Sequence, residues 1–234
     1  MKAPADDARS AGGGVASLTR HHLRTPRAAA IAGILFSVLL ISSLALLRLS
    51  VPSDPLETGT WLASSSRRVR IALNLVPFAG VAFLWFIGVL RDRLGTLEDR
   101  FFATVFLGSG LLFLGMLFVA ASAVGGLIVA YTAQPQFLFD SGAFAFGRAF
   151  AFDVMQIYAF KMAAVFMITA STLAIRTGIT PRWMALAGYG AAAFLLLCSG
   201  VFDWTLFVFP TWVLLLSSYI LRDNLRGSNW SGWQ

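Results

Sequence analysis

Long runs with almost no charged residue constrain this chain more than any other feature. Five runs are uncharged, at residues 28–47, 71–90, 101–131, 183–199 and 204–221, and another, at about 149–175, contains only Asp153 and Lys161. A helix needs about 20 apolar residues to cross the roughly 30 Å of hydrocarbon in a bilayer. Charged residues make up 12% of the chain, against about 25% in soluble domains. The sequence therefore excludes a water-soluble fold and predicts an all-α, polytopic transmembrane helical bundle with six spans.

The third run is longer than one straight crossing needs, because residues 101–131 carry no charge. We expect this helix to tilt strongly, to kink or to project beyond the bilayer. The last two runs are shorter and are joined by a tight turn at residues 200–203.

The basic residues favour one side of these spans. With both termini in the cytoplasm, twelve Lys and Arg residues would lie inside and five outside, which is the bias that the positive-inside rule describes. The inner residues would be Lys2, Arg9, Arg20, Arg24, Arg27, Arg91, Arg93, Arg100, Arg176, Arg182, Arg222 and Arg226, and the outer ones Arg48, Arg67, Arg68, Arg70 and Arg148. We therefore expect a multi-pass protein of the inner cell membrane with cytoplasmic N- and C-termini.

The chain divides into three predicted parts. Residues 1–25 are rich in Ala, Gly and Ser without apolar periodicity, which is typical of a disordered cytoplasmic tail. Residues 26–225 form the predicted six-helix domain, and residues 226–234 a second cytoplasmic tail. The first span follows a basic leader, but its 20 apolar residues exceed the usual 7–15 of a signal peptide, so we expect a retained anchor.

Two pairs of spans share their boundary residues. The first and fifth spans open with P-R-A-A-A-I-A-G at 26–33 and P-R-W-M-A-L-A-G at 181–188, and their partner spans end with V-L-R-D-R-L at 89–94 and I-L-R-D-N-L at 220–225. Each partner span also contains a proline, Pro77 or Pro210. Repeated hairpins are one way to build transporters, so one interpretation is a duplicated hairpin in spans 1–2 and 5–6. The other is that these residues only mark membrane boundaries, since Pro suits a first helical turn.

A family resemblance accompanies these motifs. The R-x-A-x-I-A-G start at 27–33 and the R-x-G-I-x-P-R-W turn at 176–183 resemble patterns in a bacterial family of six-helix membrane proteins of unknown function. The resemblance implies the six-span layout over most of the chain, but no activity and no functional residues. Sixteen Arg against two Lys also favours a GC-rich bacterial source.

The fourth span carries the polar residues that point to a function, because ionisable residues within a span are rare and often functional. Lys161 lies 15 residues from Arg176, roughly 22 Å along a helix and therefore in the outer third of the membrane. Lys161 would therefore reach toward Asp153 and Asp203, since helix side chains tilt toward the N-terminus, which is the outer end of this span. The predicted ligand-binding or pore residues are Lys161, Asp153, Gln156, Tyr158, Asp203 and Arg148. The alternative is a snorkelling lysine satisfied by a nearby carboxylate.

The predicted outer loops offer two further candidates. Arg67, Arg68 and Arg70 would hold lipid phosphates, or would only begin a solvated helix. The aromatic residues of 134–152 indicate an interfacial belt or re-entrant cap, with a vestibule for a hydrophobic ligand as the alternative.

Several kinds of site are missing from the sequence. Both histidines, His21 and His22, precede the first span, so no Ser–His dyad or HExxH zinc site can form within the bundle. Cys198 is the single cysteine, which excludes an internal disulfide. We expect no enzyme activity, catalytic residue, metal, cofactor or nucleic-acid partner; the expected partners are membrane lipid and either a second copy or another membrane subunit.

Two functions remain open at this point. The first is transport or permeation of a small, anionic or amphiphilic solute through an outward-facing polar pocket, with the second and sixth helices broken at their prolines to supply unwound backbone. The alternative is a non-transporting accessory or lipid-binding subunit whose polar residues fix helix packing.

Overall fold

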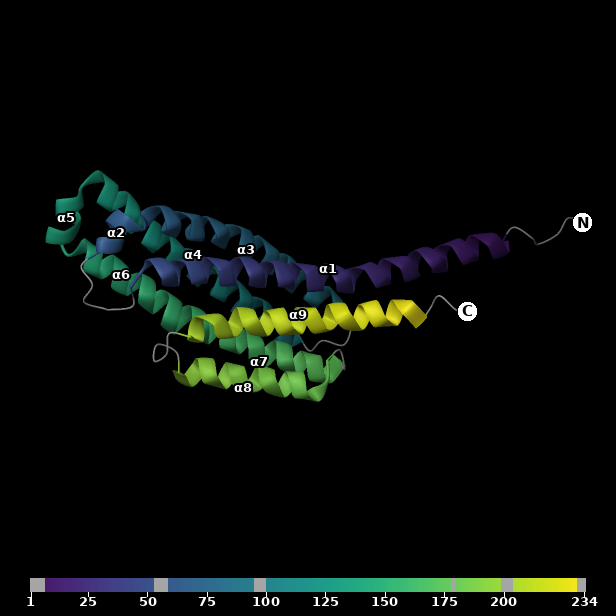
Figure 1. Ribbon diagram of the computed structural model, residues 1–234. Helices are drawn as coiled ribbons and strands as arrows, with labels where there is room; N and C mark the ends of the chain where they lie inside the picture. Colours follow the sequence, from purple (N-terminus) through teal and green to yellow (C-terminus); the bar gives the residue numbers. More distant parts are fainter. Residues whose placement is uncertain (1–6, 53–58, 95–99, 178–179, 199–203, 231–234) are drawn as a thin grey trace, which may run out of the picture.

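The computed structural model describes residues 7–52, 59–94, 100–177, 180–198 and 204–230, and within these ranges it contains helices joined by short turns and no strand (Figure 1). The elements in chain order are α1 (Asp7–Ser50), α2 (Thr60–Ser64), α3 (Ser66–Leu94), α4 (Arg100–Ala133), α5 (Pro135–Asp140), α6 (Ala143–Asp153), the π-helix η1 (Val154–Ala159), α7 (Phe160–Thr177), α8 (Arg182–Cys198) and α9 (Thr205–Trp230).

Five stretches of helix are long and apolar enough to cross a membrane. They are Ala28–Ser50, Ser66–Arg91, Phe102–Ala133, Ala143–Arg176 and Thr205–Leu225. The remaining apolar helix, α8, has 17 residues, about 25 Å at 1.5 Å per residue, which is less than the hydrocarbon thickness. The prediction of a helical membrane bundle is confirmed to this extent, whereas the sixth span stays a prediction.

Large apolar side chains lie on the outside of the bundle as well as inside it. Trp85, Phe146 and Leu197 are 69%, 72% and 81% exposed. Soluble monomers rarely present so much apolar surface, but hydrocarbon accepts it at no cost. Together with the five long apolar helices, this surface indicates an integral, multi-pass membrane protein.

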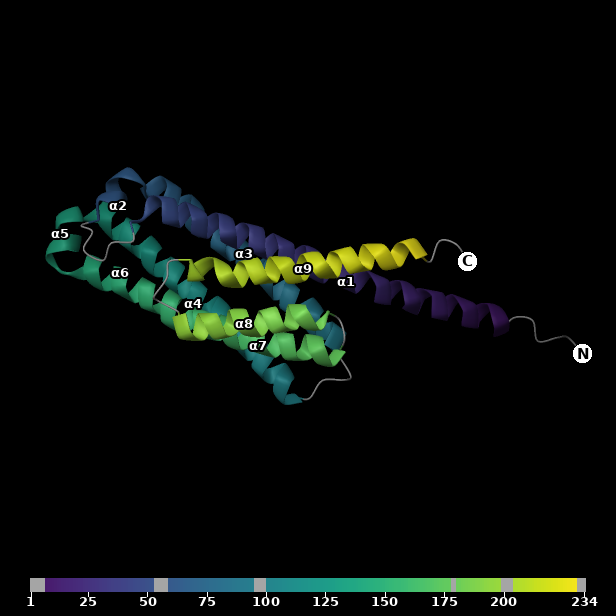
Figure 2. The same ribbon diagram turned by 60° about the horizontal axis from the view of Figure 1, so that its bottom comes forward.

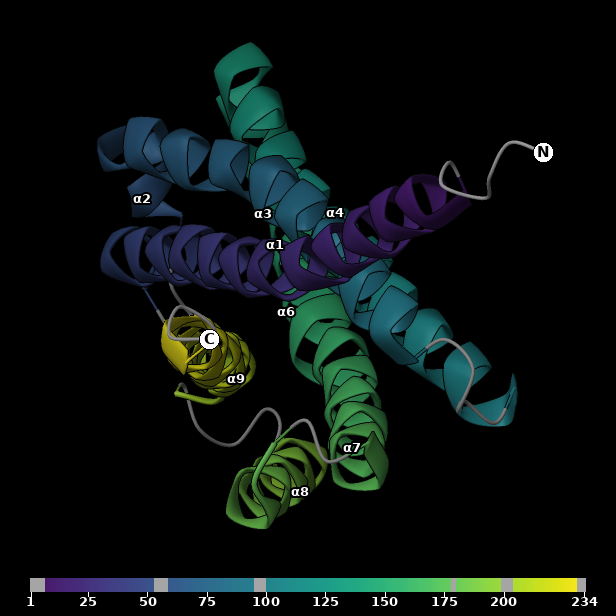
Figure 3. The same cartoon turned by 90° about the vertical axis from the view of Figure 1, so that its right-hand side faces the viewer.

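The long helices pack as two groups, one around α1 and the other around α7. α1 packs chiefly against α3 and α9, whereas α7 packs chiefly against α8 and α4. Figure 3 looks along the bundle and shows α9 between α1 and α8, with α8 beside α7. Figure 2 shows α8 lying along α7 in a second view. The fifth and sixth predicted spans, α8 and α9, therefore contact each other less than α1 contacts α3.

A second apolar cluster closes the end of the bundle that bears α2 and α5 (Figure 1). Trp61, Leu138 and Phe144 are buried in it. Gly59 begins this cap with a φ of 87°, and a Cβ there would meet the rings of Phe139 and Phe144, so the turn needs glycine for its conformation and for space. Of the phenylalanines in residues 134–152, Phe144 is buried in this cluster, whereas the others are exposed: Phe137, Phe139, Phe146, Phe150 and Phe152. The interfacial belt or re-entrant cap stays a prediction.

The prolines do not break their helices. α3 continues from Ser66 to Leu94 through Pro77, and α9 from Thr205 to Trp230 through Pro210. The expectation of two proline-broken helices is therefore wrong. A membrane-embedded helix keeps its remaining backbone hydrogen bonds because no water is present to replace them, and the irregular backbone lies instead in η1.

The first and last helices extend into both segments that the sequence predicts as tails. α1 begins at Asp7, within the segment 1–25 that the sequence predicts as disordered, and α9 continues to Trp230. Extending an existing helix costs less than starting one, so a long span can continue into the residues that flank it. Residues 1–6 and 231–234 lie outside the described residues.

Candidate functional site

Phenylalanine rings fill the centre of the bundle. The ring of Phe83 has five aromatic neighbours at centroid distances of 4.6–6.2 Å: Phe36, Phe86, Phe113, Phe166 and Phe209. These residues come from α1, α3, α4, α7 and α9, and each is at most 1% exposed. Edge-to-face and tilted ring pairs at such distances add to the stability of the packing. The centre of the bundle is thus a packed apolar core rather than a polar pathway.

The fourth span is helical from Ala143 to Arg176 but changes its winding at η1. π-helical turns are rare and frequently occur at functional sites. Here the π-turn lies between Asp153 and Lys161, the two charged residues of the fourth span that belong to the predicted site. An α-helix would place these residues about 80° apart around its axis. A π-turn takes up one extra residue and so reduces the angle between Asp153 and Lys161 around the helix axis. Both side chains are exposed.

The predicted pocket residues therefore fall into two groups. Asp153, Tyr158 and Lys161 are exposed on the outside of the fourth span, with Tyr158 57% exposed. Gln156 points inward, is 4% exposed, and accepts a hydrogen bond from the Thr205 hydroxyl at 3.4 Å. Gln156 thus joins the fourth span to α9 through a polar contact with Thr205, a residue that was not predicted from the sequence.

The other two predicted pocket residues do not extend this contact. Arg148 is half-buried and its guanidinium donates a hydrogen bond to the carbonyl of Pro52 at 2.9 Å, which ties α6 to the segment after α1. Asp203 lies outside the described residues. The six residues remain a predicted site, of which the described part comprises a buried Gln156–Thr205 contact and an exposed charged face.

We define the charged face as the exposed residues Phe150, Asp153, Ile157 and Lys161, which follow one another at intervals of three or four. Within the described part of the chain, no ion pair or hydrogen bond joins Lys161 to another residue. A lysine at the centre of a bilayer costs about 2.5–3.5 kcal/mol on insertion scales. Because Lys161 is about 22 Å from Arg176 along the helix, it lies away from the centre of the span, so its cost is lower, but it still favours an anionic neighbour.

The predicted lipid-binding arginines are all exposed at the start of α3. Arg67, Arg68 and Arg70 lie on its first turns, and Arg68 donates a hydrogen bond to the Ser65 hydroxyl at 3.1 Å. Their exposure leaves the guanidinium groups accessible to lipid phosphates, and this role stays a prediction.

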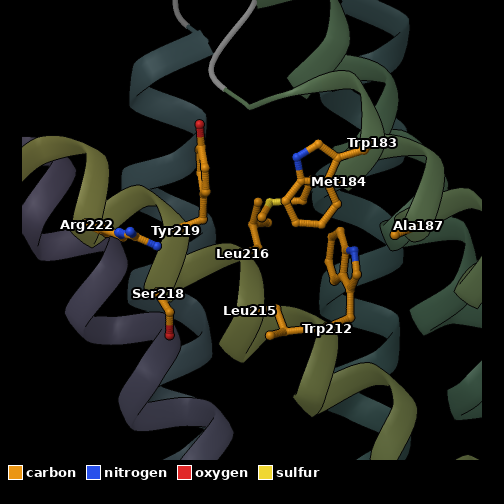
Figure 4. Close-up of a pocket in the computed structure, with 9 residues that line it drawn as sticks. All are labelled: Trp183, Met184, Ala187, Trp212, Leu215, Leu216, Ser218, Tyr219 and Arg222. Atoms are coloured by element: carbon orange, nitrogen blue, oxygen red, sulfur yellow. The ribbon is translucent and has the colours of Figure 1, made fainter.

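A groove between α8 and α9 was missed by the sequence analysis. It has a volume of about 320 Å³, and Figure 4 shows the indole rings of Trp183 and Trp212 beside it and Arg222 at one end. The spacing of Trp212, Leu216, Tyr219 and Arg222 places them along one side of α9, as residues three or four apart are. This periodicity was visible in the sequence, but nothing there indicated that α8 would pack against α7 and leave this side open.

Among the described residues, no group of three or more His, Cys, Asp or Glu side chains could hold a metal ion. No family model, curated protein or solved structure matches the chain. The resemblance to a six-helix bacterial family therefore stays a prediction.

Proposed function

We propose that the protein is a non-transporting membrane protein that acts as an accessory subunit and binds another transmembrane protein through the charged face of its fourth span. The observation that carries this proposal is the exposure of Lys161, an ionisable residue within a span. Intramembrane charges almost always face a bundle interior or a cavity. A charge on the outside of this bundle becomes an interior residue when another helix packs against it.

The aromatic core supports a non-transporting role. A solute that crossed along the bundle axis would have to displace Phe83 and its neighbours, which are buried and in mutual contact. None of these side chains could hydrogen-bond to a polar solute. The polar residues that would serve transport lie mostly at the periphery instead.

The charged face also indicates the chemistry of the partner. In a symmetric pair of copies the same surface meets itself, so Lys161 would approach a second lysine at equal depth. A different transmembrane helix that carries a carboxylate near that depth would instead neutralise the ammonium. The proposed partner is therefore another protein with an acidic residue in the outer third of a span.

A photo-crosslinking amino acid at position 157 tests this proposal, because Ile157 belongs to the charged face and is 37% exposed. In the native membrane we expect one specific adduct from this position and none from Val119, a control on α4 that is 42% exposed. The adduct should disappear with Lys161→Met and persist with Lys161→Arg. An adduct with a second copy, or one that Lys161→Met leaves unchanged, would overturn the assignment.

Transport is the second candidate, favoured by the buried Gln156–Thr205 contact beside η1. Buried polar groups next to irregular backbone are a common arrangement in transporters. Purified protein in vesicles should pass no more anionic or amphiphilic solute than protein-free vesicles. Flux above that level, abolished by Gln156→Leu, would support transport and contradict the accessory role.

A further inference from the structure

The groove between α8 and α9 combines an apolar wall with a charged end. Trp183 and Leu215 are 64% and 60% exposed along it, and the small side chain of Ala187 also lines it. Figure 4 shows Arg222 beyond Tyr219, at the far end of the groove from Trp212. The groove therefore suits an occupant with a long apolar part and one polar end.

The charge at the polar end is positive. Arg222 lines the groove and is exposed, and Arg182, also exposed, begins α8 next to the groove residue Trp183. No acidic residue lines the groove. Asp223, four residues after Tyr219, lies on the same side of α9 but does not line the groove, so Arg182 and Arg222 leave this end with a net positive charge. An anionic group at this end is therefore favoured, and a guanidinium binds phosphate through paired hydrogen bonds.

The depth of the groove in the membrane indicates which kind of amphiphile it can bind. Arg182 precedes the uncharged run 183–199 and Arg222 follows the uncharged run 204–221, which places both near the level of the lipid phosphates. The apolar wall extends from there toward the middle of the bilayer. A phospholipid in the leaflet on this side would place its phosphate at Arg222 and an acyl chain along Leu215 and Trp212.

Close packing at one level of the helices limits the groove. A Cβ at Gly188 would clash with the Ser171 hydroxyl of α7 and would approach Trp212 Nε1 of α9 to 2.9 Å, so α8 lies close to both helices at Gly188. The groove continues from Trp212 along Leu215 and Tyr219 toward Arg222.

We propose that this groove is a binding site for one anionic phospholipid, whose phosphate group is held by Arg222 and whose acyl chain lies between α8 and α9. The proposal does not depend on the partner proposed for the fourth span, because the two surfaces share no residue. The proposal specifies the class of lipid headgroup, a monoanionic phosphodiester such as phosphatidylglycerol. It assigns no enzymatic activity to the groove.

Native mass spectrometry of the full chain, purified in detergent and mixed with equal amounts of phosphatidylglycerol and phosphatidylcholine, tests the headgroup. We expect the first bound lipid to be phosphatidylglycerol, with its retention lowered about tenfold by Arg222→Gln and restored in part by Arg222→Lys. Arg91→Gln is the matched control, since Arg91 is exposed and precedes Asp92 as Arg222 precedes Asp223, but it does not line the groove. Equal retention of the two lipids, or equal loss in the two glutamine variants, would overturn the proposal.

Filling the groove without changing its charge tests the acyl chain. Ala187→Leu should lower retention of phosphatidylglycerol severalfold, whereas Ala193→Leu, an equal change at another exposed position of α8, should not. Thermal unfolding in detergent checks that each variant is folded, and both positions are exposed so that a larger side chain can be accommodated. Unchanged retention in Ala187→Leu would show that the lipid is bound at the arginine but outside the groove, which contradicts the assignment.

Discussion

The α1–α3 hairpin and the α8–α9 hairpin have similar boundary residues but pack differently. α1 packs extensively against α3, and the Ser43 hydroxyl in α1 donates a hydrogen bond to the Ala72 carbonyl in α3 at 2.7 Å. α8 instead packs against α7, to which the Thr172 and Tyr189 hydroxyls connect it at 2.7 Å, and a groove separates it from part of α9. Similar boundary motifs thus define where helices enter the membrane, whereas the side chains along each helix decide which neighbour it contacts.

One local feature is nevertheless shared by the two hairpins. Gly33 and Gly188 each lie seven residues after the proline that opens the motif. A Cβ at either glycine would clash with a serine hydroxyl on a neighbouring helix, Ser217 or Ser171. The small glycine permits this close approach between helices, as small residues do in membrane proteins. The likeness of the hairpins therefore extends from the boundary into the packing, although duplication itself stays a prediction.

The largest difference between the hairpins should appear when a large side chain is removed from each. Phe83→Ala in α3 removes a ring with 0% exposure from the aromatic core, and such changes cost about 3–5 kcal/mol. Leu215→Ala in α9 removes a side chain that is 60% exposed along the groove and should change the free energy of unfolding much less. Unfolding by a denaturing detergent in mixed micelles measures both. If both variants lowered the free energy of unfolding by a similar amount, the groove side of α9 would have to be covered by protein.

A smaller effect is expected from the two packed glycines. Gly33→Ala and Gly188→Ala should each lower the free energy of unfolding by about 1–3 kcal/mol, because overpacking forces neighbouring helices apart. Gly88→Ala in α3 and Gly190→Ala in α8 are matched controls, since a Cβ at either position meets no atom within 4 Å. These controls should be neutral or slightly stabilising, because Ala favours helix. A loss confined to Gly33 would show that only the first hairpin depends on this close contact.

The smallest effect is expected from single hydroxyl groups. Ser43→Ala removes the hydrogen bond between α1 and α3, and hydrogen bonds between transmembrane helices average about 0.6 kcal/mol. Ser218→Ala, at an exposed position lining the groove, should leave the free energy of unfolding unchanged. The same detergent titration measures the free energy of unfolding of both variants. A larger decrease for Ser218→Ala than for Ser43→Ala would indicate that α8 and α9 are joined through Ser218.

The positions of the long apolar helices could largely be predicted from the sequence, but little of the candidate site. The expected limits 28–47 and 71–90 agree with the observed stretches Ala28–Ser50 and Ser66–Arg91 to within a few residues, because charged residues stop a helix from entering hydrocarbon. The π-turn at η1 could not be predicted, because its residues are equally compatible with an ordinary α-helical turn. Without that turn, the exposure of both Asp153 and Lys161 could not be deduced from their spacing.

The apolar runs by themselves determined that this chain forms long membrane-crossing helices, because hydrocarbon accepts no unpaired backbone group and sets the length of each crossing. Only the tertiary structure decided which helices are neighbours, that Lys161 faces outward while Gln156 faces α9, and that a groove ends at Arg222. The reason is physical. A transmembrane helix is apolar on every side, so its hydropathy does not reveal which side is buried, and contacts such as those of Gly33 and Gly188 decide it.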